Sequence, residues 1–76
     1  MEIEIVGSGC AKCKKTEKLV KKVVEELGVQ ADIIKIEDIN EISNRGIALT
    51  PAVVIDGVVK IIGRVPSIDE LKKILQ

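Results

Sequence analysis

The spacing of hydrophobic residues changes twice in the first half of the chain. Residues 2–6 alternate glutamate with aliphatic side chains and predict a strand. After the turn signal at residues 7–9, apolar residues from Cys10 to Leu27 recur every three or four positions, which predicts a helix with one buried stripe. Residues 31–36 predict a second strand. Together these elements form a βαβ unit, in which the strands should be parallel and the crossover right-handed.

The second half predicts a short helix, a hairpin and a final helix. Asp38, with Glu41 three residues later, is typical of a helix start, so we expect a short helix over residues 39–45 with Ile39 and Ile42 toward the core. The strand signals at residues 52–55 and 58–62 are joined by Asp56-Gly57, a strong hairpin signal. Another capping box, Ser67 with Glu70, precedes a last helix whose core residues should be Ile68, Leu71, Ile74 and Leu75.

These elements follow the order βαβαββα. The order indicates an α/β fold with a four-stranded mixed sheet flanked by helices. With 76 residues, the chain is long enough for one small domain, and we expect residues 1–76 to form it, as a monomer.

Composition removes several classes of function. The 12 basic and 12 acidic residues cancel and no aromatic residue is present, which argues against a nucleic-acid-binding protein. The longest uncharged stretch, residues 46–55, is far shorter than the ~20 residues of a membrane span. Residues 1–6 lack the features of a secretory signal, so we expect a cytoplasmic protein.

The chemistry available is limited, because the chain has no His and only two cysteines, Cys10 and Cys13. Their i, i+3 spacing at a helix start brings the Cα atoms within disulfide range. The helix N-terminus and nearby lysines, Lys12 among them, favour a thiolate at Cys10, which would be the attacking nucleophile. Cys13 begins the apolar stripe and would resolve a mixed disulfide.

Other interpretations of the cysteine pair remain open. A structural disulfide would close a loop of about four residues and contribute only ~2 kcal/mol. A closed zinc site needs four ligands, and a His-free monomer with one cysteine pair supplies two. A two-coordinate soft ion such as Cu(I) is the remaining alternative, in which the same two thiolates would make the chain a metal carrier. A CxxC near a βαβ pattern favours redox chemistry.

Three further positions are candidates for the site. Pro51 opens a strand, where the ordinary interpretation is a trans proline and the functional one is a cis Thr50–Pro51 bond that exposes Thr50 to an extended substrate. Glu4 is either an exposed carboxylate near the sheet edge or a partly buried one beneath the cysteines that accepts the Cys13 proton. Gly63 is a turn residue that could also let a substrate backbone approach.

The zero net charge conceals two segments of opposite sign. Residues 10–24 carry six Lys and one Glu, a net of +5, and residues 25–41 have a net of −5. Charge runs are usually solvated faces, but the basic one surrounds the CxxC end and could steer acidic partner surfaces.

The chain resembles the small redox-active disulfide proteins of the thioredoxin superfamily, between thioredoxins and glutaredoxins. The resemblance covers nearly all 76 residues and rests on four segments: 7–13 with the CxxC, 49–52 with Thr50-Pro51, Asp56-Gly57, and 63–67 before the last helix. It implies a thioredoxin-like fold, a cis Pro51 facing the pair, and Cys10 and Cys13 as nucleophile and resolving thiol. It also implies protein disulfides and dithiols as partners, no bound cofactor, and electrons from an external flavin-dependent reductase.

Overall fold

The computed structural model describes residues 1–7, 9 and 11–76. Its elements in chain order are β1 (Glu2–Val6), α1 (Ala11–Leu27), β2 (Asp32–Ile36), α2 (Ile39–Asn44), β3 (Ala52–Ile55), β4 (Val58–Ile62) and α3 (Ile68–Leu75). This order is the predicted βαβαββα, and the ends of the elements fall within a residue of those expected from the sequence.

The strands form a four-stranded mixed sheet in the order β2-β1-β3-β4. β1 is parallel to β2 and antiparallel to β3, and β3 is antiparallel to β4. The parallel pair is the one that the βαβ unit predicted. Val6, at the end of β1, pairs with Ala52, at the start of β3, so the segment leading into α1 and the loop entering β3 meet at the same end of the two central strands.

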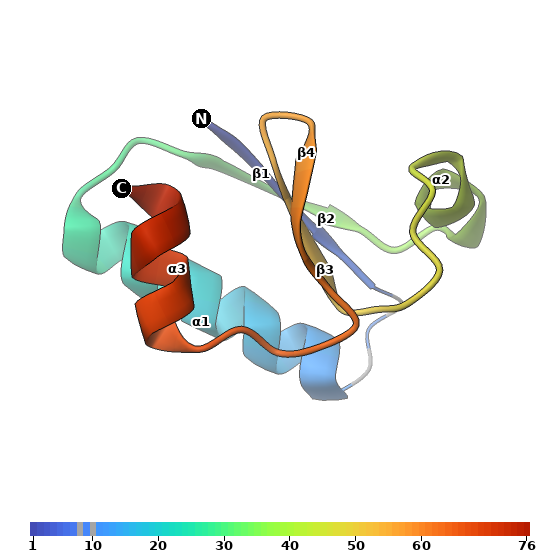
Figure 1. The fold of residues 1–76 in the computed structure, drawn as a ribbon, viewed down its shortest axis with the longest axis horizontal. Coiled ribbons are helices and arrows are strands. Elements are labelled where there is room, and N and C mark those ends of the chain that lie inside the picture. Colours follow the sequence, from blue (N-terminus) through green and yellow to red (C-terminus); the bar gives the residue numbers. More distant parts are fainter. Residues whose placement is uncertain (8, 10) are drawn as a thin grey trace.

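Each face of the sheet has its own core, because successive side chains on a strand point to opposite faces. One core packs Ile3 and Ile5 of β1 against Val20 of α1 and Leu71 of α3. The other packs Val6 against Ile42 of α2 and neighbouring strand residues. In Figure 1, α1 and α3 accordingly lie together, and α2 lies at the far end of the sheet.

The turns and helix starts have the local chemistry that the sequence predicted. Asp56 and Gly57 both have positive φ, as a two-residue hairpin turn requires. The Asp38 carboxylate accepts hydrogen bonds from the N–H groups of Asn40 and Glu41 at the start of α2. At α3 the capping box of Ser67 and Glu70 is complete in both directions. These contacts fix where α2 and α3 begin.

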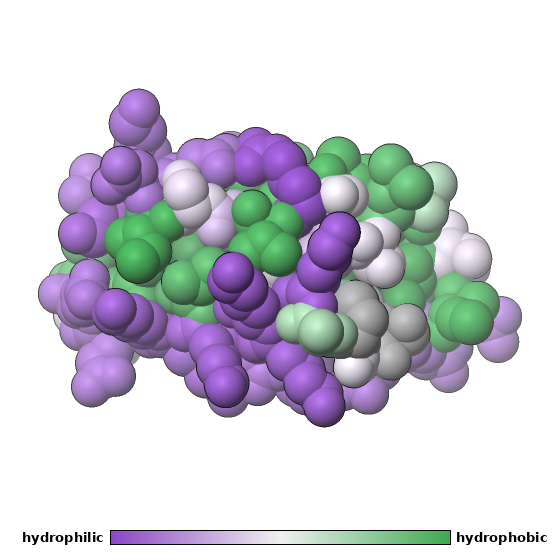
Figure 2. Space-filling model, turned by 90° about the horizontal axis from the view of Figure 1, so that it is seen from below, coloured by the Kyte–Doolittle hydropathy of each residue, from purple (hydrophilic) through white to green (hydrophobic). Residues whose placement is uncertain are grey.

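One core prediction is wrong. Ile39 was expected to face the core with Ile42, but it is 72% exposed, and only Ile42 is buried. Ile39 is the first residue of the six-residue α2, whereas Ile42 lies one turn further along it. Seen from below, Figure 2 shows hydrophilic side chains along α1 and hydrophobic ones emerging on the side of α2.

Candidate active site

Cys13 lies in the first turn of α1 and is buried, with 6% of its surface exposed. It occupies the predicted stripe together with Thr16, whose hydroxyl donates a 2.9 Å hydrogen bond to the Lys12 carbonyl oxygen. Because its hydroxyl is hydrogen-bonded, Thr16 can be buried without leaving a polar group unpaired. Cys10, the other cysteine of the predicted pair, lies outside the described residues.

The backbone of Gly7 closes one side of the Cys13 thiol. Gly7 follows β1, and its N–H donates a 2.9 Å hydrogen bond to the Ile36 carbonyl oxygen of β2. A Cβ atom at this position would overlap the Sγ atom of Cys13 and would lie 3.9 Å from the Cβ atom of Thr50. Only glycine fits between the helix and the loop before β3. Cys13, Gly7 and Thr50 therefore converge on one small region.

The loop before β3 places Thr50 and Pro51 beside this region. The Thr50–Pro51 peptide bond is cis, the geometry expected from the sequence, and Pro51 is buried whereas Thr50 is partly exposed. The Pro51 carbonyl oxygen accepts a 2.9 Å hydrogen bond from the Gly63 N–H. Gly63 faces the side chain of Leu49, which a Cβ atom on Gly63 would approach to 3.1 Å. Gly63 thus contacts the proline loop of its own chain.

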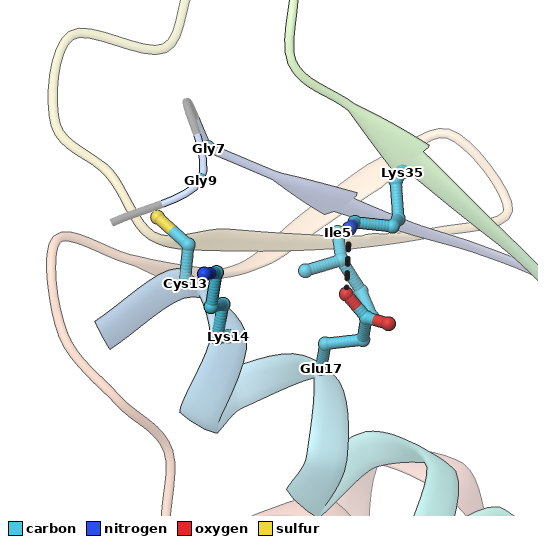
Figure 3. Close-up of a pocket in the computed structure, with 7 residues that line it drawn as sticks. All are labelled: Ile5, Gly7, Gly9, Cys13, Lys14, Glu17 and Lys35. Carbon is cyan, nitrogen blue, oxygen red and sulfur yellow. Dashed lines mark ion pairs between the residues drawn. The ribbon is translucent and has the colours of Figure 1, made fainter. Parts of the chain in front are cut away.

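A pocket opens next to the thiol (Figure 3). Its lining comes from β1, the start of α1 and β2, and consists of Ile5, Gly7, Gly9, Cys13, Lys14, Glu17 and Lys35. Ile5 and Lys35 are register partners in the parallel pair, which explains why Lys35 reaches the α1 side of the sheet. The pocket therefore joins a buried thiol to a group of charged side chains.

Glu17 is the acidic side chain among the residues that line this pocket. It lies four residues after Cys13 on the same side of α1. Its carboxylate forms ion pairs with Lys21 at 2.9 Å and with Lys35 at 3.1 Å. These hydrogen bonds, from Lys21 first and then Lys35, hold the pKa of Glu17 below its ordinary value, so it is ionised at neutral pH. Glu17 and Glu37 in turn raise the pKa of Lys35.

Comparison with known proteins identifies the family. A model of the thioredoxin domain matches residues 1–76. A thioredoxin from Methanocaldococcus jannaschii is 46% identical over 74 residues, which cover 97% of this chain and 85% of that protein. A thioredoxin from Methanothermobacter thermautotrophicus is 44% identical over 75 residues, covering 99% of this chain and 97% of that protein.

The chain belongs to the thioredoxin domain family. It is therefore a thiol–disulfide oxidoreductase, and its βαβαββα order with a four-stranded mixed sheet is a thioredoxin-like fold. The comparisons give no support to the Cu(I)-type carrier. Within the described part of the chain, no helix is both long and apolar enough to cross a membrane.

This member of the thioredoxin family does not place Glu4 beneath the cysteine. Glu4 alternates with Ile3 and Ile5, so its side chain projects from the face of the sheet opposite α1. There it accepts two hydrogen bonds from the Arg45 guanidinium, at 3.1 and 2.8 Å. These bonds lower the pKa of Glu4 despite partial burial. Glu4 therefore lies away from Cys13, and with 15% of its side chain exposed it is ion-paired with Arg45 rather than free at the surface.

Gly7, Glu17 and Lys35 lie at the site but were not predicted from the sequence. Gly7 was interpreted only as part of a turn, because its contact with Cys13 depends on how α1 packs against β1. Glu17 carried a usable signal, since the i, i+4 spacing from Cys13 puts both on one side of a helix. Lys12, a predicted modulator, lies in the first turn of α1 and is exposed.

Proposed function

We propose that this chain exchanges two electrons with protein disulfides through Cys10 and Cys13. The observation that carries the proposal is the position of Cys13, a buried thiol in the first turn of a helix, packed against Gly7 and close to Thr50. In a thiol–disulfide oxidoreductase, two cysteines spaced i, i+3 at a helix start are the groups that this chemistry needs.

The reaction starts with the Cys10 thiolate, which attacks one sulfur of the substrate disulfide. The substrate S–S bond breaks, the leaving sulfur takes up a proton, and Cys10 is joined to the substrate in a mixed disulfide. Cys13 then loses its proton and attacks the Cys10 sulfur, which releases the second substrate thiol. Two electrons have passed to the substrate, and Cys10 and Cys13 are left as a disulfide.

We propose roles for the other predicted residues from their surroundings. The positive end of the α1 helix dipole and the exposed Lys12 favour a thiolate at Cys10, which precedes α1 in the sequence. We assign Thr50, Pro51 and Gly63 to substrate binding, and the hydrogen bond from Gly63 to Pro51 ties the two segments together. Glu4 has no part, because Arg45 holds it on the other face.

The cycle needs no bound cofactor, but it does need an external electron donor. A thioredoxin-reductase-type protein would return the Cys10–Cys13 disulfide to the dithiol form. A reducing compartment such as the cytoplasm suits a chain whose working form is a dithiol. We further propose that residues 1–76 act as one domain and as a monomer, in line with the family match over that whole length.

Trapping of the mixed disulfide tests this proposal. The Cys13→Ser variant can form the mixed disulfide but cannot resolve it, so incubation with insulin should yield a covalent adduct through Cys10, detected by mass spectrometry and released by dithiothreitol. The matched Cys10→Ser variant should yield no adduct. The absence of an adduct with Cys13→Ser, or an equal adduct with Cys10→Ser, would contradict the assignment.

A further inference from the structure

The charges of α1 run against its helix dipole at both ends. A helix is stabilised by acidic residues in its first turn and basic residues in its last turn. The first turn of α1 has no acidic residue and carries Lys12 and Lys14, whereas its last turn has no basic residue and carries Glu25 and Glu26. The helix therefore gives up stabilisation at each end, and its basic end is the one at the site.

The other helices of the protein follow the rule. α3 has Asp69 and Glu70 in its first turn and Lys72 and Lys73 in its last. α2 follows it at its start, where Glu41 lies in the first turn, although its last turn has no basic residue. The reversed charges of α1 are thus a property of that helix rather than of the chain, and a departure from local stabilisation often marks a functional surface.

Lysines also repeat along the exposed side of α1. Lys14, Lys18 and Lys22 are exposed and spaced four residues apart, so each is the neighbour of the next on the helix surface. Like charges at this spacing oppose helix formation. Among the described residues, none of these three forms an ion pair, while neighbouring Lys21 is paired with Glu17. The row is therefore an unneutralised basic surface.

This basic surface begins at the site. Lys14 lines the pocket that contains Cys13 (Figure 3), and hydrophilic side chains continue along α1 in Figure 2. Activation of a thiolate can account for Lys12 and Lys14. It does not account for Lys18 and Lys22, which lie about 7.5 and 13.5 Å further along the helix axis from Cys13, about one and nearly two Debye lengths at physiological salt.

We propose that Lys14, Lys18 and Lys22 form a docking surface for a protein partner that carries acidic residues beside its reactive disulfide. This inference rests on the proposed function and names the partner class of that same site. A protein partner is favoured over nucleic acid because the chain has zero net charge and no aromatic residue for base stacking. A basic patch next to the thiol brings an acidic disulfide to it faster, and salt weakens the effect.

Three synthetic peptide disulfides provide the test, identical except that the residues flanking the cysteines are glutamate, glutamine or lysine. With dithiothreitol as electron donor, kcat/KM at low ionic strength should be about 10-fold higher for the acidic than for the basic peptide. At high salt the ratio should fall to within about twofold. The Lys18→Glu/Lys22→Glu variant should reverse the order, with unchanged kcat/KM for hydroxyethyl disulfide, a small neutral substrate.

A matched control separates a local surface from net charge. The Lys60→Glu/Lys73→Glu variant makes the same charge change at exposed positions on β4 and α3, and should keep the preference for the acidic peptide. Equal rates for all three peptides, or an equal loss of preference in both variants, would overturn the docking surface. If hydroxyethyl disulfide is still reduced in that case, the proposed function stands. A failure to reduce even that small disulfide would overturn both. The docking surface for a protein partner would also be overturned if the protein bound a DNA duplex more tightly than the acidic peptide and the Lys18→Glu/Lys22→Glu variant lost this DNA binding.

Discussion

Helices α1 and α3 pack side by side on the same face of the sheet, yet they are built by different rules. α3 has a complete capping box, acidic residues at its start, basic residues at its end, and Leu71 and Leu75 in the core. α1 contributes Val20 and Val23 to that core, but its ends carry the charges that oppose its dipole. The comparison indicates that all of α3 contributes to the stability of the fold. In α1 the middle of the helix does so, whereas its N-terminus is arranged for the thiol chemistry.

The contrast between the middle and the ends of α1 also explains how a small chain tolerates unfavourable charges at the start of this helix. The first turn of α1 is held by the tertiary contact of buried Cys13 with Gly7, and within the helix by the hydrogen bond from the Thr16 hydroxyl to the Lys12 carbonyl oxygen. The helix further along is fixed by Val20 and Val23, which are fully buried. Changes near the α1 start should therefore alter turnover first, and changes in α3 should alter the free energy of unfolding first.

The largest effect is expected for Gly7→Ala. The new Cβ atom would overlap the Cys13 Sγ atom, so the thiol must move, and turnover of a protein disulfide should fall about 100-fold. The strain should also lower the free energy of unfolding by about 1–3 kcal/mol. Gly46→Ala is the control: its Cβ meets no atom within 4 Å, although its positive φ makes the change destabilising, so turnover should persist. Full activity of Gly7→Ala would contradict the packing at the site.

The next effect is on stability and belongs to α3. Leu71 is fully buried, and Leu71→Ala should lower the free energy of unfolding by about 2–5 kcal/mol. Urea denaturation measures the loss, and turnover, divided by the folded fraction, should stay within about twofold of wild type. A fall in turnover per folded molecule comparable to that of Gly7→Ala would break the division between the two helices.

A smaller effect compares the carboxylates on the two faces of the sheet. In a Cys10→Ser background, Glu17→Gln should lower the pKa of the Cys13 thiol, because it removes an anion from a pocket that keeps Lys14 and Lys35. Glu4→Gln should leave that pKa unchanged, because Glu4 lies on the opposite face with Arg45. Thiolate absorbance near 240 nm follows the titration without interference from Tyr or Trp. Equal shifts from both variants would refute the placement of Glu4.

The smallest effect is the pH dependence that the start of α3 contributes. The hydrogen bonds from Arg64, and then from the Ser67 backbone, lower the pKa of Glu70 from 4.5 to about 2. A carboxyl with a lowered folded-state pKa stabilises the fold fully above about pH 4.5, and the contribution is lost as the pH falls toward 2. Urea midpoints of wild type and Glu70→Gln should therefore differ most at neutral pH and converge in acid. A difference that grows in acid would contradict this linkage.

Most of the fold could be predicted from sequence, because its signals are local. The spacing of hydrophobic residues, the Asp56-Gly57 turn and the Ser67–Glu70 capping box each depend on residues a few positions apart. Local motifs also predicted the position of Cys13 in the first turn of α1 and of Thr50–Pro51 just before β3. Gly7 and Lys35 were missed because their role depends on which strand lies beside α1. The position of Glu4 could not be predicted, because its alternation with Ile3 and Ile5 does not determine which face of β1 packs against α1.

A redox titration of the two thiols tests most simply whether Cys10 and Cys13 act as one redox-active pair. The protein is equilibrated with mixtures of reduced and oxidised dithiothreitol, alkylated, and analysed by mass spectrometry. We expect a single two-electron transition, about 30 mV per tenfold change, in which Cys10 and Cys13 lose their alkylation together and are linked within one chain. A Cys13 thiol that stays alkylatable at every ratio, or a disulfide found only between chains, would contradict it.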